Sequence, residues 1–379
     1  MLDSMNSPVH SDGRRCRERF RRLLLDWYDT HARDLPWRKD RDPYRVWLSE
    51  IMLQQTRVAA VIEHYHEFLR RFPSVKKLAA ARESSVLAAW SGLGYYRRAR
   101  MLHAAAKVIV RELAGKFPTT AAELRTLPGI GRYTSAAIAS IAFGEPIAVV
   151  DGNVERVVQR FSGKRAAQEK LWQTAEELLD RERPGDFNQA MMELGAEVCM
   201  PRCPVCLMCP VVGVCATRGE LPGKPKAAKQ KKREAHYVLD SRDGAVYLVQ
   251  RSRNARLMAG MWELPEVQAD ANRAADFSLR HSITVTDYTV LVRRSASPAG
   301  TPGQWIRLEK LHRIALTGLA RKILRKAELM SGSRASIKPI GCDESSNPVS
   351  KVIVRRTIHE GIGCRYEGTG SRVEDDGRK

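Results

Sequence analysis

Five of the eight cysteines in this 379-residue chain lie between positions 199 and 215. Four of them, Cys199, Cys206, Cys209 and Cys215, are separated by six, two and five residues. Thiolates this close together can converge on one metal centre, because soft sulfur ligands suit zinc and iron-sulfur clusters. Buried structural thiols and a four-thiolate zinc site are the alternatives. Cys203, a fifth thiol, also forms a two-residue-spaced pair with Cys206, which leaves the first ligand in question.

A glutamate in the segment DPYRVWLSEIMLQQT is the first candidate for acid-base chemistry. Asp42 and Pro43 are typical of a helix start. On the helix that follows, Glu50 shares a face with apolar residues at offsets of three and four. Desolvation there would raise its pKa toward the near-neutral value that a general acid needs. A glutamate that faces solvent or pairs with a nearby arginine is the alternative.

Asp151 is a second candidate carboxylate, in the phrase VVDGNVERVVQR. It precedes a predicted helix, where aspartate is also a common N-cap, and it can serve both purposes. Twenty residues before it, the turn LPGIG places Gly129 and Gly131 in front of another predicted helix. Glycines let backbone amides at a helix N-terminus face an anion, so this turn is a candidate phosphate site. A plain turn is the alternative.

The elements that must position these residues are helices. From residue 19 to residue 196, apolar residues recur at spacings of three and four, with breaks at prolines and glycines. This pattern predicts an all-α domain over residues 16–217, which ends in the cysteine segment 199–215. Residues 1–15 are polar and unpatterned, and we expect a disordered lead-in.

The second half of the chain has a different pattern. Residues 218–234 are basic and contain prolines, which predicts an exposed linker. Residues 235–330 contain β-like runs, among them 281–294, and a helix near their end, which together predict a smaller α+β domain. Residues 331–379 lack periodicity, and we expect a mostly disordered tail.

Composition limits the function classes. A 43% hydrophobic content suits a globular chain, and 64 Lys and Arg against 43 Asp and Glu give a net charge of +21, which favours a nucleic-acid partner. A merely basic, solvated surface is the alternative. The sequence shows no apolar run of about 18 residues for a membrane span and no export segment, and its cysteines are clustered rather than spread as in secreted proteins. We therefore expect a cytoplasmic protein, nucleoid-associated if bacterial. We also expect a monomer.

Six motifs in this order resemble those of the MutY-type adenine DNA glycosylases, within the endonuclease III superfamily. They are LPWR at 35–38, WLSEIMLQQT at 47–56, GLGYYRRAR at 92–100, LPGIGRYTSAAI at 127–138, DGNVERV at 151–157 and FNQAMMELGAEVC at 187–199. The resemblance covers residues 23–217. It implies a helix-hairpin-helix enzyme of base excision repair that flips adenine, mispaired with 8-oxoguanine or guanine, out of double-stranded DNA and hydrolyses its N-glycosidic bond.

The resemblance also implies residue roles. Glu50 would protonate the adenine, and Asp151, with Asn153 beside it, would stabilise the oxocarbenium-like sugar. Tyr133 stands where bifunctional relatives carry a lysine, and a phenol forms no Schiff base, so the enzyme would be monofunctional. A [4Fe-4S] cluster would be held by Cys199, Cys206, Cys209 and Cys215. The adenine pocket would include Trp37, Arg38, Gln189 and Glu193, and the DNA contacts would include Gln54, Gln55, Tyr95, Gly129 and Gly131.

The start of the second domain resembles the Nudix-like domain of the same family, although residues 255–280 lack the glutamate-dense helix of a working Nudix hydrolase. The family's loop for 8-oxoguanine corresponds to the stretch RHSITV, which makes His281, Ser282 and Thr284 candidates for lesion recognition. A simple edge strand is the alternative for this stretch. Two other functions remain: a pyrimidine glycosylase and lyase, which Tyr133 argues against, and a DNA-binding iron-sulfur module without catalysis.

Overall fold

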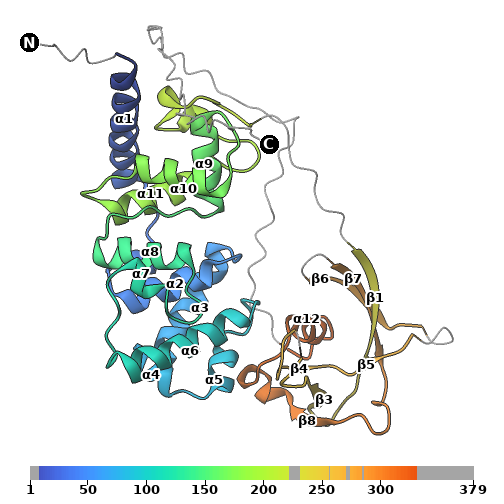
Figure 1. Ribbon diagram of the computed structural model, residues 1–379. Helices are drawn as coiled ribbons and strands as arrows, with labels where there is room; N and C mark the ends of the chain where they lie inside the picture. Colours follow the sequence, from blue (N-terminus) through green and yellow to red (C-terminus); the bar gives the residue numbers. More distant parts are fainter. Residues whose placement is uncertain (1–7, 222–230, 256, 270–273, 284–285, 331–379) are drawn as a thin grey trace, which may run out of the picture.

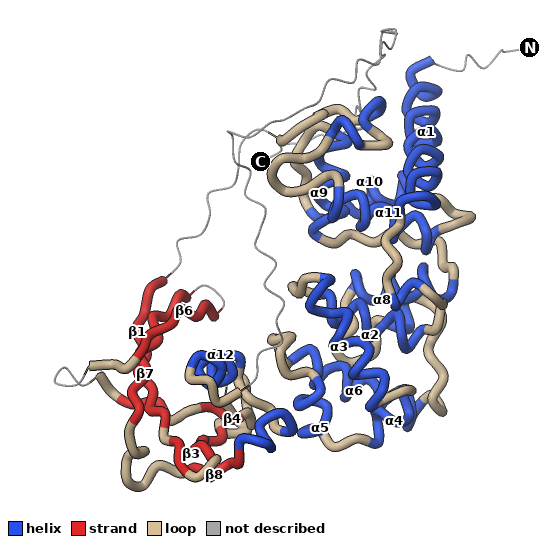
Figure 2. The backbone as a smooth tube through the Cα atoms, turned by 180° about the vertical axis from the view of Figure 1, so that it is seen from behind, coloured by secondary structure: helices blue, strands red, loops and turns tan. Residues whose placement is uncertain are grey.

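The computed structural model describes residues 8–221, 231–255, 257–269, 274–283 and 286–330 (Figure 1). A helical part comes first along the chain and a part with mixed sheets follows it, as Figure 2 shows from behind. The predicted order of an all-α domain and then an α+β domain is confirmed.

One group of helices contains both the first and the last helices of the helical part. They are α1 (Pro8–His31), α9 (Gly152–Ser162), α10 (Gln168–Leu178) and α11 (Pro184–Glu197). The fully buried ring of Phe20 joins α1 to its neighbours, because it lies 4.8 Å from the ring of Phe161 and 6.4 Å from that of Phe187. This aromatic contact brings both ends of the helical sequence into one core.

Helix α1 corrects one prediction. It begins at Pro8, so the expected disordered lead-in over residues 1–15 is wrong for residues 8–15. Their polar sequence has no apolar stripe that could indicate a helix. Helical hydrogen bonds extend outward at little cost once the packed part of a helix has formed, which explains the longer helix.

The second group of helices comes from the middle of the helical sequence. It consists of α2 (Pro43–Leu53), α3 (Val58–Arg71), α4 (Val75–Ala80), α5 (Glu83–Ala89), α6 (Arg97–Glu112), α7 (Ala121–Leu124) and α8 (Arg132–Phe143). Helix α8 packs against both α2 and α11 and so connects the two groups (Figure 1). Its approach to α11 requires a glycine: a Cβ on Gly185 would lie 2.7 Å from the carbonyl oxygen of Ser140.

The second part of the chain holds two four-stranded sheets. The strands are β1 (Lys231–Leu239), β2 (Ser241–Arg242), β3 (Ala245–Gln250), β4 (Trp262–Glu263), β5 (Glu266–Val267), β6 (Phe277–Ile283), β7 (Thr286–Arg294) and β8 (Gly303–Arg307). One sheet has the order β5-β1-β7-β6, and in the other β3 pairs with β2, β4 and β8. Helix α12 (Gly318–Lys326) buries Ile323 and Leu324 in the core of this part.

Two boundaries differ from the prediction. Strand β1 begins at Lys231, inside the expected linker of residues 218–234, because residues 231–234 pair in parallel with β7. The run 281–294, expected as one strand, contains the end of β6 and all of β7, which pair antiparallel. Both differences depend on strand pairing, which a local pattern does not reveal. Residues 222–230 and the expected tail over 331–379 lie outside the described residues.

The two parts touch where helix α6 begins. The hydroxyl of Tyr96 donates to the carbonyl oxygen of Leu316 at 2.9 Å, and Arg321 donates to the hydroxyl of Ser91. The 3-10 turn η4 (Leu308–Arg313) packs against α5. The segment from 91 to 96 is therefore shared between both parts.

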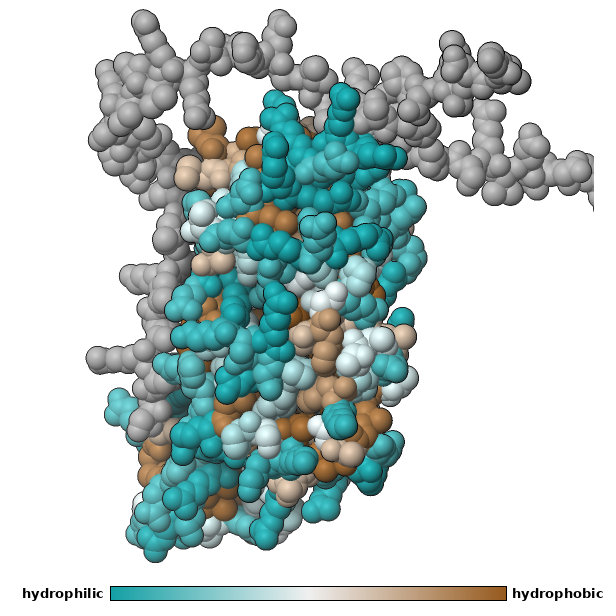
Figure 3. Space-filling model, turned by 90° about the vertical axis from the view of Figure 1, so that its left-hand side faces the viewer, coloured by the Kyte–Doolittle hydropathy of each residue, from teal (hydrophilic) through white to brown (hydrophobic). Residues whose placement is uncertain are grey.

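The molecular surface is mainly polar on the face shown in Figure 3, where hydrophilic side chains surround smaller apolar patches. Among the described residues, no helix combines the length and the apolar character that crossing a membrane requires. The helices instead bury their apolar stripes in the two cores.

Candidate active site

A cavity of about 680 Å³ is lined by residues of α2, α8, α9, α11 and the 3-10 turn η1 (Pro36–Arg38). Twelve residues that the sequence analysis singled out line it. They are Trp37, Arg38, Glu50, Gln54, Gln55, Gly129, Gly131, Tyr133, Asp151, Asn153, Gln189 and Glu193. The fold therefore brings together side chains that are spread over more than 150 positions of the sequence.

Glu50 is positioned by helix α2. The helix starts as expected, with Pro43 in its first turn and Asp42 as the N-cap, whose carboxylate accepts the backbone N–H of Arg45 at 2.9 Å. Glu50 itself is 5% exposed. Burial raises its pKa to about 7, partly opposed by a hydrogen bond from Tyr133. A carboxyl group with this pKa exchanges a proton near neutral pH, as a general acid must.

Tyr133, on helix α8, is the polar partner of Glu50. Its hydroxyl donates to Oε2 of Glu50 at 2.5 Å, and the sulfur of Met192 lies 3.4 Å from the hydroxyl oxygen of Tyr133. Burial and the charges of Glu50 and Asp151 raise the pKa of Tyr133 well above its ordinary value. Tyr133 is therefore neutral at physiological pH and acts as a hydrogen-bond donor to the carboxylate.

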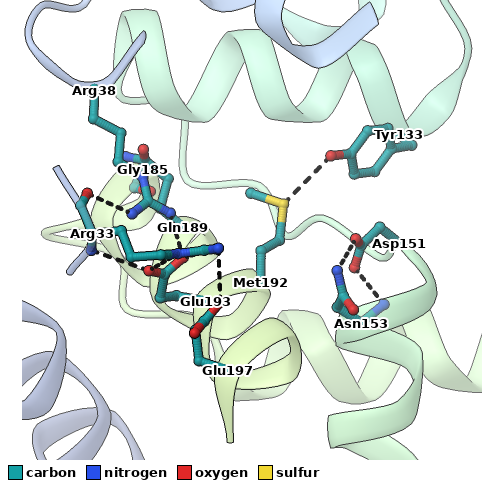
Figure 4. Close-up of polar contacts among 10 residues, drawn as sticks. All are labelled: Arg33, Arg38, Tyr133, Asp151, Asn153, Gly185, Gln189, Met192, Glu193 and Glu197. Carbon is teal, nitrogen blue, oxygen red and sulfur yellow. Dashed lines mark hydrogen bonds and ion pairs between the residues drawn. The ribbon is translucent and has the colours of Figure 1, made fainter. Parts of the chain in front are cut away.

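Asp151 is the N-cap of α9, so the prediction that it caps this helix is confirmed. One carboxylate oxygen accepts the backbone N–H groups of Asn153 at 2.9 Å and Val154 at 2.7 Å, and the other accepts the Asn153 side chain at 3.0 Å. Figure 4 shows the two contacts between Asp151 and Asn153. Burial raises the pKa of Asp151 above its ordinary value, while these hydrogen bonds favour the charged form. The carboxylate is thus fixed in position at the wall of the cavity.

Arg156 extends this arrangement toward the cysteine segment. Its guanidinium donates to the side-chain oxygen of Asn153 at 2.8 Å, to the carbonyl of Gly195 at 2.6 Å and to the carbonyl of Cys199 at 2.6 Å. One side chain therefore connects the neighbour of Asp151 with the first cysteine of the cluster of thiols. The sequence analysis missed Arg156, although its three-residue spacing from Asn153 on a helix predicts that the two side chains meet.

Glu193 is held by two arginines on the opposite side of Met192 from Tyr133 (Figure 4). Arg33 donates to it from Nε and Nη2, both at 2.7 Å, and Arg38 donates at 2.8 Å. Burial alone would raise the pKa of Glu193, but these hydrogen bonds lower it to about 2. Glu193 therefore stays charged, whereas Glu50 in the same cavity titrates near neutrality, and carboxyl groups with such different pKa values are typical of acid-base sites.

Two further residues of the expected adenine pocket also line the cavity. Trp37 is 7% exposed and packs its ring 5.5 Å from that of Tyr65, so it belongs to the core as well. The amide of Gln189 donates to the carbonyl of Gly185 at 3.3 Å, within its own helix. Neither residue is free to turn without breaking a contact.

The glycine turn precedes helix α8. Gly129 has a φ of +76°, and a Cβ at this position would lie 2.4 Å from the Cβ of Met101, so no larger residue fits. Gly131 is the N-cap of the 12-residue helix α8. Such a helix start can bind an anion such as a DNA phosphate.

Gln54, Gln55 and Tyr95 lie around the rim. Gln54 donates to the hydroxyl of Thr134 at 3.3 Å. Gln55 and Tyr95 have φ values of +56° and +47°, which are rare for residues with a side chain, and both are exposed. Tyr95 is 55% exposed and, unlike the two glutamines, is not among the described residues that line the cavity.

Of the four spaced cysteines, Cys199 follows the end of helix α11, and the other three lie on or directly after the 3-10 turns η2 (Cys206–Met208) and η3 (Val212–Val214). No disulfide joins them. Burial, together with the charges of the three neighbouring thiols, raises the pKa of Cys209 to about 11. Arg160 donates to the sulfur of Cys199 at 3.3 Å.

The donor set fits a metal cluster in its chemistry, because it consists of four thiols near one another. In the described part of the chain, however, no three His, Cys, Asp or Glu side chains are arranged as ligands of a single metal ion. Cys203 is exposed and has a φ of +50°.

His281 and Ser282 lie on strand β6, at the edge of its sheet. The hydroxyl of Ser282 donates to Asp287 at 2.5 Å on the neighbouring strand. Thr284 lies outside the described residues. The role of this strand in lesion recognition stays a prediction, as does the Nudix-like character of this part.

The family of the chain follows from comparison with known proteins. A family model described as HhH-GPD superfamily base excision DNA repair protein matches residues 48–181. The chain is 41% identical over 312 residues to the adenine DNA glycosylase of Homo sapiens, across 65% of this chain and 57% of that protein. It is 33% identical over 339 residues to the adenine DNA glycosylase of Schizosaccharomyces pombe, across 71% of this chain and 74% of that protein. The chain belongs to the adenine DNA glycosylase family.

A solved structure of a thermostable thymine-DNA glycosylase is also similar, with a TM-score of 0.51 and 31% identity, over 54% of this chain and 98% of that chain. The adenine DNA glycosylases of human, rat and mouse are longer, and the chain spans 57% to 60% of their length. Within the family fold, the site residues that sequence reasoning missed are two arginines, Arg33 and Arg156. Arginine is abundant in this chain, so residue type alone gave no signal for Arg33.

Proposed function

We propose that this member of the adenine DNA glycosylase family hydrolyses the N-glycosidic bond of adenine in DNA. The observation that carries the proposal is the buried Glu50, which accepts a hydrogen bond from Tyr133 in a cavity that also contains Asp151. With a pKa of about 7, Glu50 is protonated in a substantial fraction of molecules at neutral pH. It can therefore give a proton to a base that enters the cavity.

The proposed reaction uses the two carboxyl groups in different ways. Glu50 protonates the adenine ring, so the base leaves as a neutral molecule when the bond to the sugar breaks. Asp151, held by three hydrogen bonds, supplies a fixed negative charge that stabilises the oxocarbenium-like sugar. Water then adds to the sugar. The adenine must first leave the base stack to reach these groups.

Monofunctional chemistry is part of the proposal. A glycosylase with lyase activity needs an amine that attacks the sugar. No lysine is among the described residues that line the cavity, and Tyr133 is occupied as the hydrogen-bond donor to Glu50. We therefore expect an intact but abasic strand as the product.

For the substrate, we propose double-stranded DNA that carries adenine opposite 8-oxoguanine or guanine, bound by a monomer. The net charge of +21 and the glycine turn before α8 favour binding of the phosphate backbone. His281 and Ser282 are the proposed contacts to the oxidised base. The names of the family relatives support adenine as the excised base.

For the cofactor, we propose a [4Fe-4S] cluster held by Cys199, Cys206, Cys209 and Cys215. Such a cluster would supply a rigid, redox-capable centre that holds the cysteine segment in shape. The test is metal analysis of anaerobically purified protein. Iron and acid-labile sulfide contents near four atoms per chain would support the proposal, and stoichiometric zinc would contradict it.

The test is a single-turnover incubation with duplexes that carry adenine opposite 8-oxoguanine, adenine opposite guanine, or thymine opposite guanine, resolved on a denaturing gel. A break at adenine only after alkali supports the proposal. A break without alkali indicates a lyase. Tight binding without any break indicates a non-catalytic DNA-binding module. Glu50→Gln is the matched control, because it keeps the side-chain shape but cannot donate the carboxyl proton.

A further inference from the structure

The guanidinium of Arg98, in the first turn of α6, lies between two separate turns of the chain. Its Nη1 donates to carbonyls at the end of α2 and just beyond it, and its Nη2 donates to the segment before α6 and to one hydroxyl. The acceptors are Ile51 at 2.7 Å, Met52 at 3.0 Å, Gln54 at 2.6 Å, Thr56 at 3.2 Å, Leu93 at 3.1 Å and Gly94 at 3.3 Å. One planar group thus binds residues more than 35 positions apart.

Each of these two turns carries an exposed residue with a strained backbone. Gln55, with a φ of +56°, directly follows the accepting carbonyl of Gln54, and Tyr95, with a φ of +47°, directly follows that of Gly94. A non-glycine residue in this region costs about 1–3 kcal/mol and persists only when its surroundings hold it. Arg98 supplies hydrogen bonds to the peptide groups that precede both residues.

The rings on either side add to this arrangement. The cation lies 5.5 Å from the ring centroid of Trp90, which is fully buried, and 5.5 Å from that of Tyr95, which is exposed. The indole N–H of Trp90 also donates to the carbonyl of Gly94 at 3.1 Å. Tyr95 is therefore stacked against a cation that is itself anchored on the core.

We infer that Arg98 is a positioning residue that fixes Gln55 and Tyr95 as one rigid unit, so that both reach the duplex at a constant separation. The inference rests on the proposed function and on the DNA contacts that the family resemblance implies for these two side chains. Arg98 is not among the described residues that line the cavity, so it acts through the two turns rather than on the base. A lysine at position 98 would have a single ammonium group in place of the planar guanidinium with its two amino groups, so it cannot bind both turns at once.

The experiment compares the full-length protein with Arg98→Lys and with Arg111→Lys, a matched control on the exposed far end of the same helix. Hydrogen exchange measures the stability of the two turns directly and does not depend on catalytic activity. We expect faster exchange in Arg98→Lys at the amides of Thr56 and Leu93, which donate to the carbonyls of Leu53 and Trp90 in the two turns, and no change in Arg111→Lys. Faster exchange at only one turn, or at neither, overturns the inference. Faster exchange throughout α2 and α6 indicates a general structural role and also overturns it.

Excision gives the second readout. Single-turnover rates are measured on a duplex with adenine opposite 8-oxoguanine and on one with adenine opposite an abasic site, where no partner base has to be separated. We expect Arg98→Lys to lose at least about tenfold on the paired substrate and much less on the unpaired one. An equal loss on both substrates, or no loss, contradicts the inference. If the wild-type protein excises nothing, the proposed function fails, while the exchange data still decide the role of Arg98.

A double-variant cycle supplies the last check. If Arg98 works through Gln55 and Tyr95, adding Arg98→Lys to a Gln55→Ala, Tyr95→Ala variant should slow excision of the paired substrate by less than about twofold. Additive losses would show that Arg98 acts independently of the two side chains and would overturn the inference.

Discussion

The hydrogen bond from Tyr133 to Glu50 should set the upper pH limit of base excision. It stabilises the ionised carboxylate, and so opposes the effect of burial and holds the pKa of Glu50 at about 7. Replacing Tyr133 with Phe keeps the ring and removes the donor. A hydrogen bond to a charged group contributes about 1.5–3 kcal/mol, and 1.36 kcal/mol corresponds to one pKa unit, so the pKa of Glu50 should rise by roughly one to two units.

The direction of the effect is fixed by the role of Glu50 as an acid. The group acts when protonated, so the excision rate is highest below its pKa and declines as the pH rises through it. In the wild type this decline should centre near pH 7. In Tyr133→Phe it should centre about one to two pH units higher. Below pH 6 the two proteins should have similar rates, because both carry the proton.

The assay is a single-turnover pH profile from pH 5 to 9 on duplex DNA with adenine opposite 8-oxoguanine, with DNA binding measured in parallel. Glu50→Gln should be inactive throughout and provides the baseline. A decline that stays at the same pH in Tyr133→Phe, or that moves to lower pH, would refute the reasoning. A uniform loss at all pH values would show that Tyr133 acts on the substrate rather than on the pKa of Glu50.

Three other predictions follow from the same contacts. Folding raises the pKa of Glu50 from 4.5 to about 7, so its stabilising effect is complete below pH 4.5 and is lost as the pH rises through 7. In urea titrations, Glu50→Gln should therefore exceed the wild type in unfolding free energy at pH 8 by up to about 3 kcal/mol, and the difference should vanish below about pH 4. Arg156→Gln should lower both the excision rate and the iron content per chain, because it removes the donor shared by Asn153 and the cysteine segment; unchanged values of both would contradict the link. Tyr96→Phe should weaken the contact between the two parts by about 1 kcal/mol, seen as faster hydrogen exchange near Leu316 without a change in the exchange of α9.

Local sequence patterns were sufficient to predict the helical character of the first part and the apolar environment of Glu50. The three- and four-residue spacing that placed Glu50 on an apolar face of α2 agrees with its 5% exposure. The same reasoning could not find the partners of Glu193, because Arg33 lies 160 positions away and meets it only after α11 folds against the start of the chain. The predicted start of β1 was wrong for a similar reason, since residues 231–234 become part of a strand only by pairing with β7, which lies more than 50 positions further along the chain.

Long-range hydrogen bonds also explain why the role of Arg98 was not visible. Its acceptors are mostly backbone carbonyls, which every residue has, so no residue type in the sequence indicates them. The strained positions of Gln55 and Tyr95 were equally hidden, since neither residue type favours a positive φ.

The adjacent residues Tyr95 and Tyr96 face in different directions. Tyr95 is exposed, whereas Tyr96 is buried and donates a hydrogen bond to Leu316 in the second part of the chain. Surface segments between helices usually tolerate insertions and deletions during evolution. Here, adding or deleting one residue between Ser91 and Arg98 would exchange an exposed ring for a buried one and separate the guanidinium from its acceptors. We expect selection to preserve the length of this segment more strictly than the identity of its exposed residues, and variants that shift it by one residue to lose both domain contact and DNA probing together.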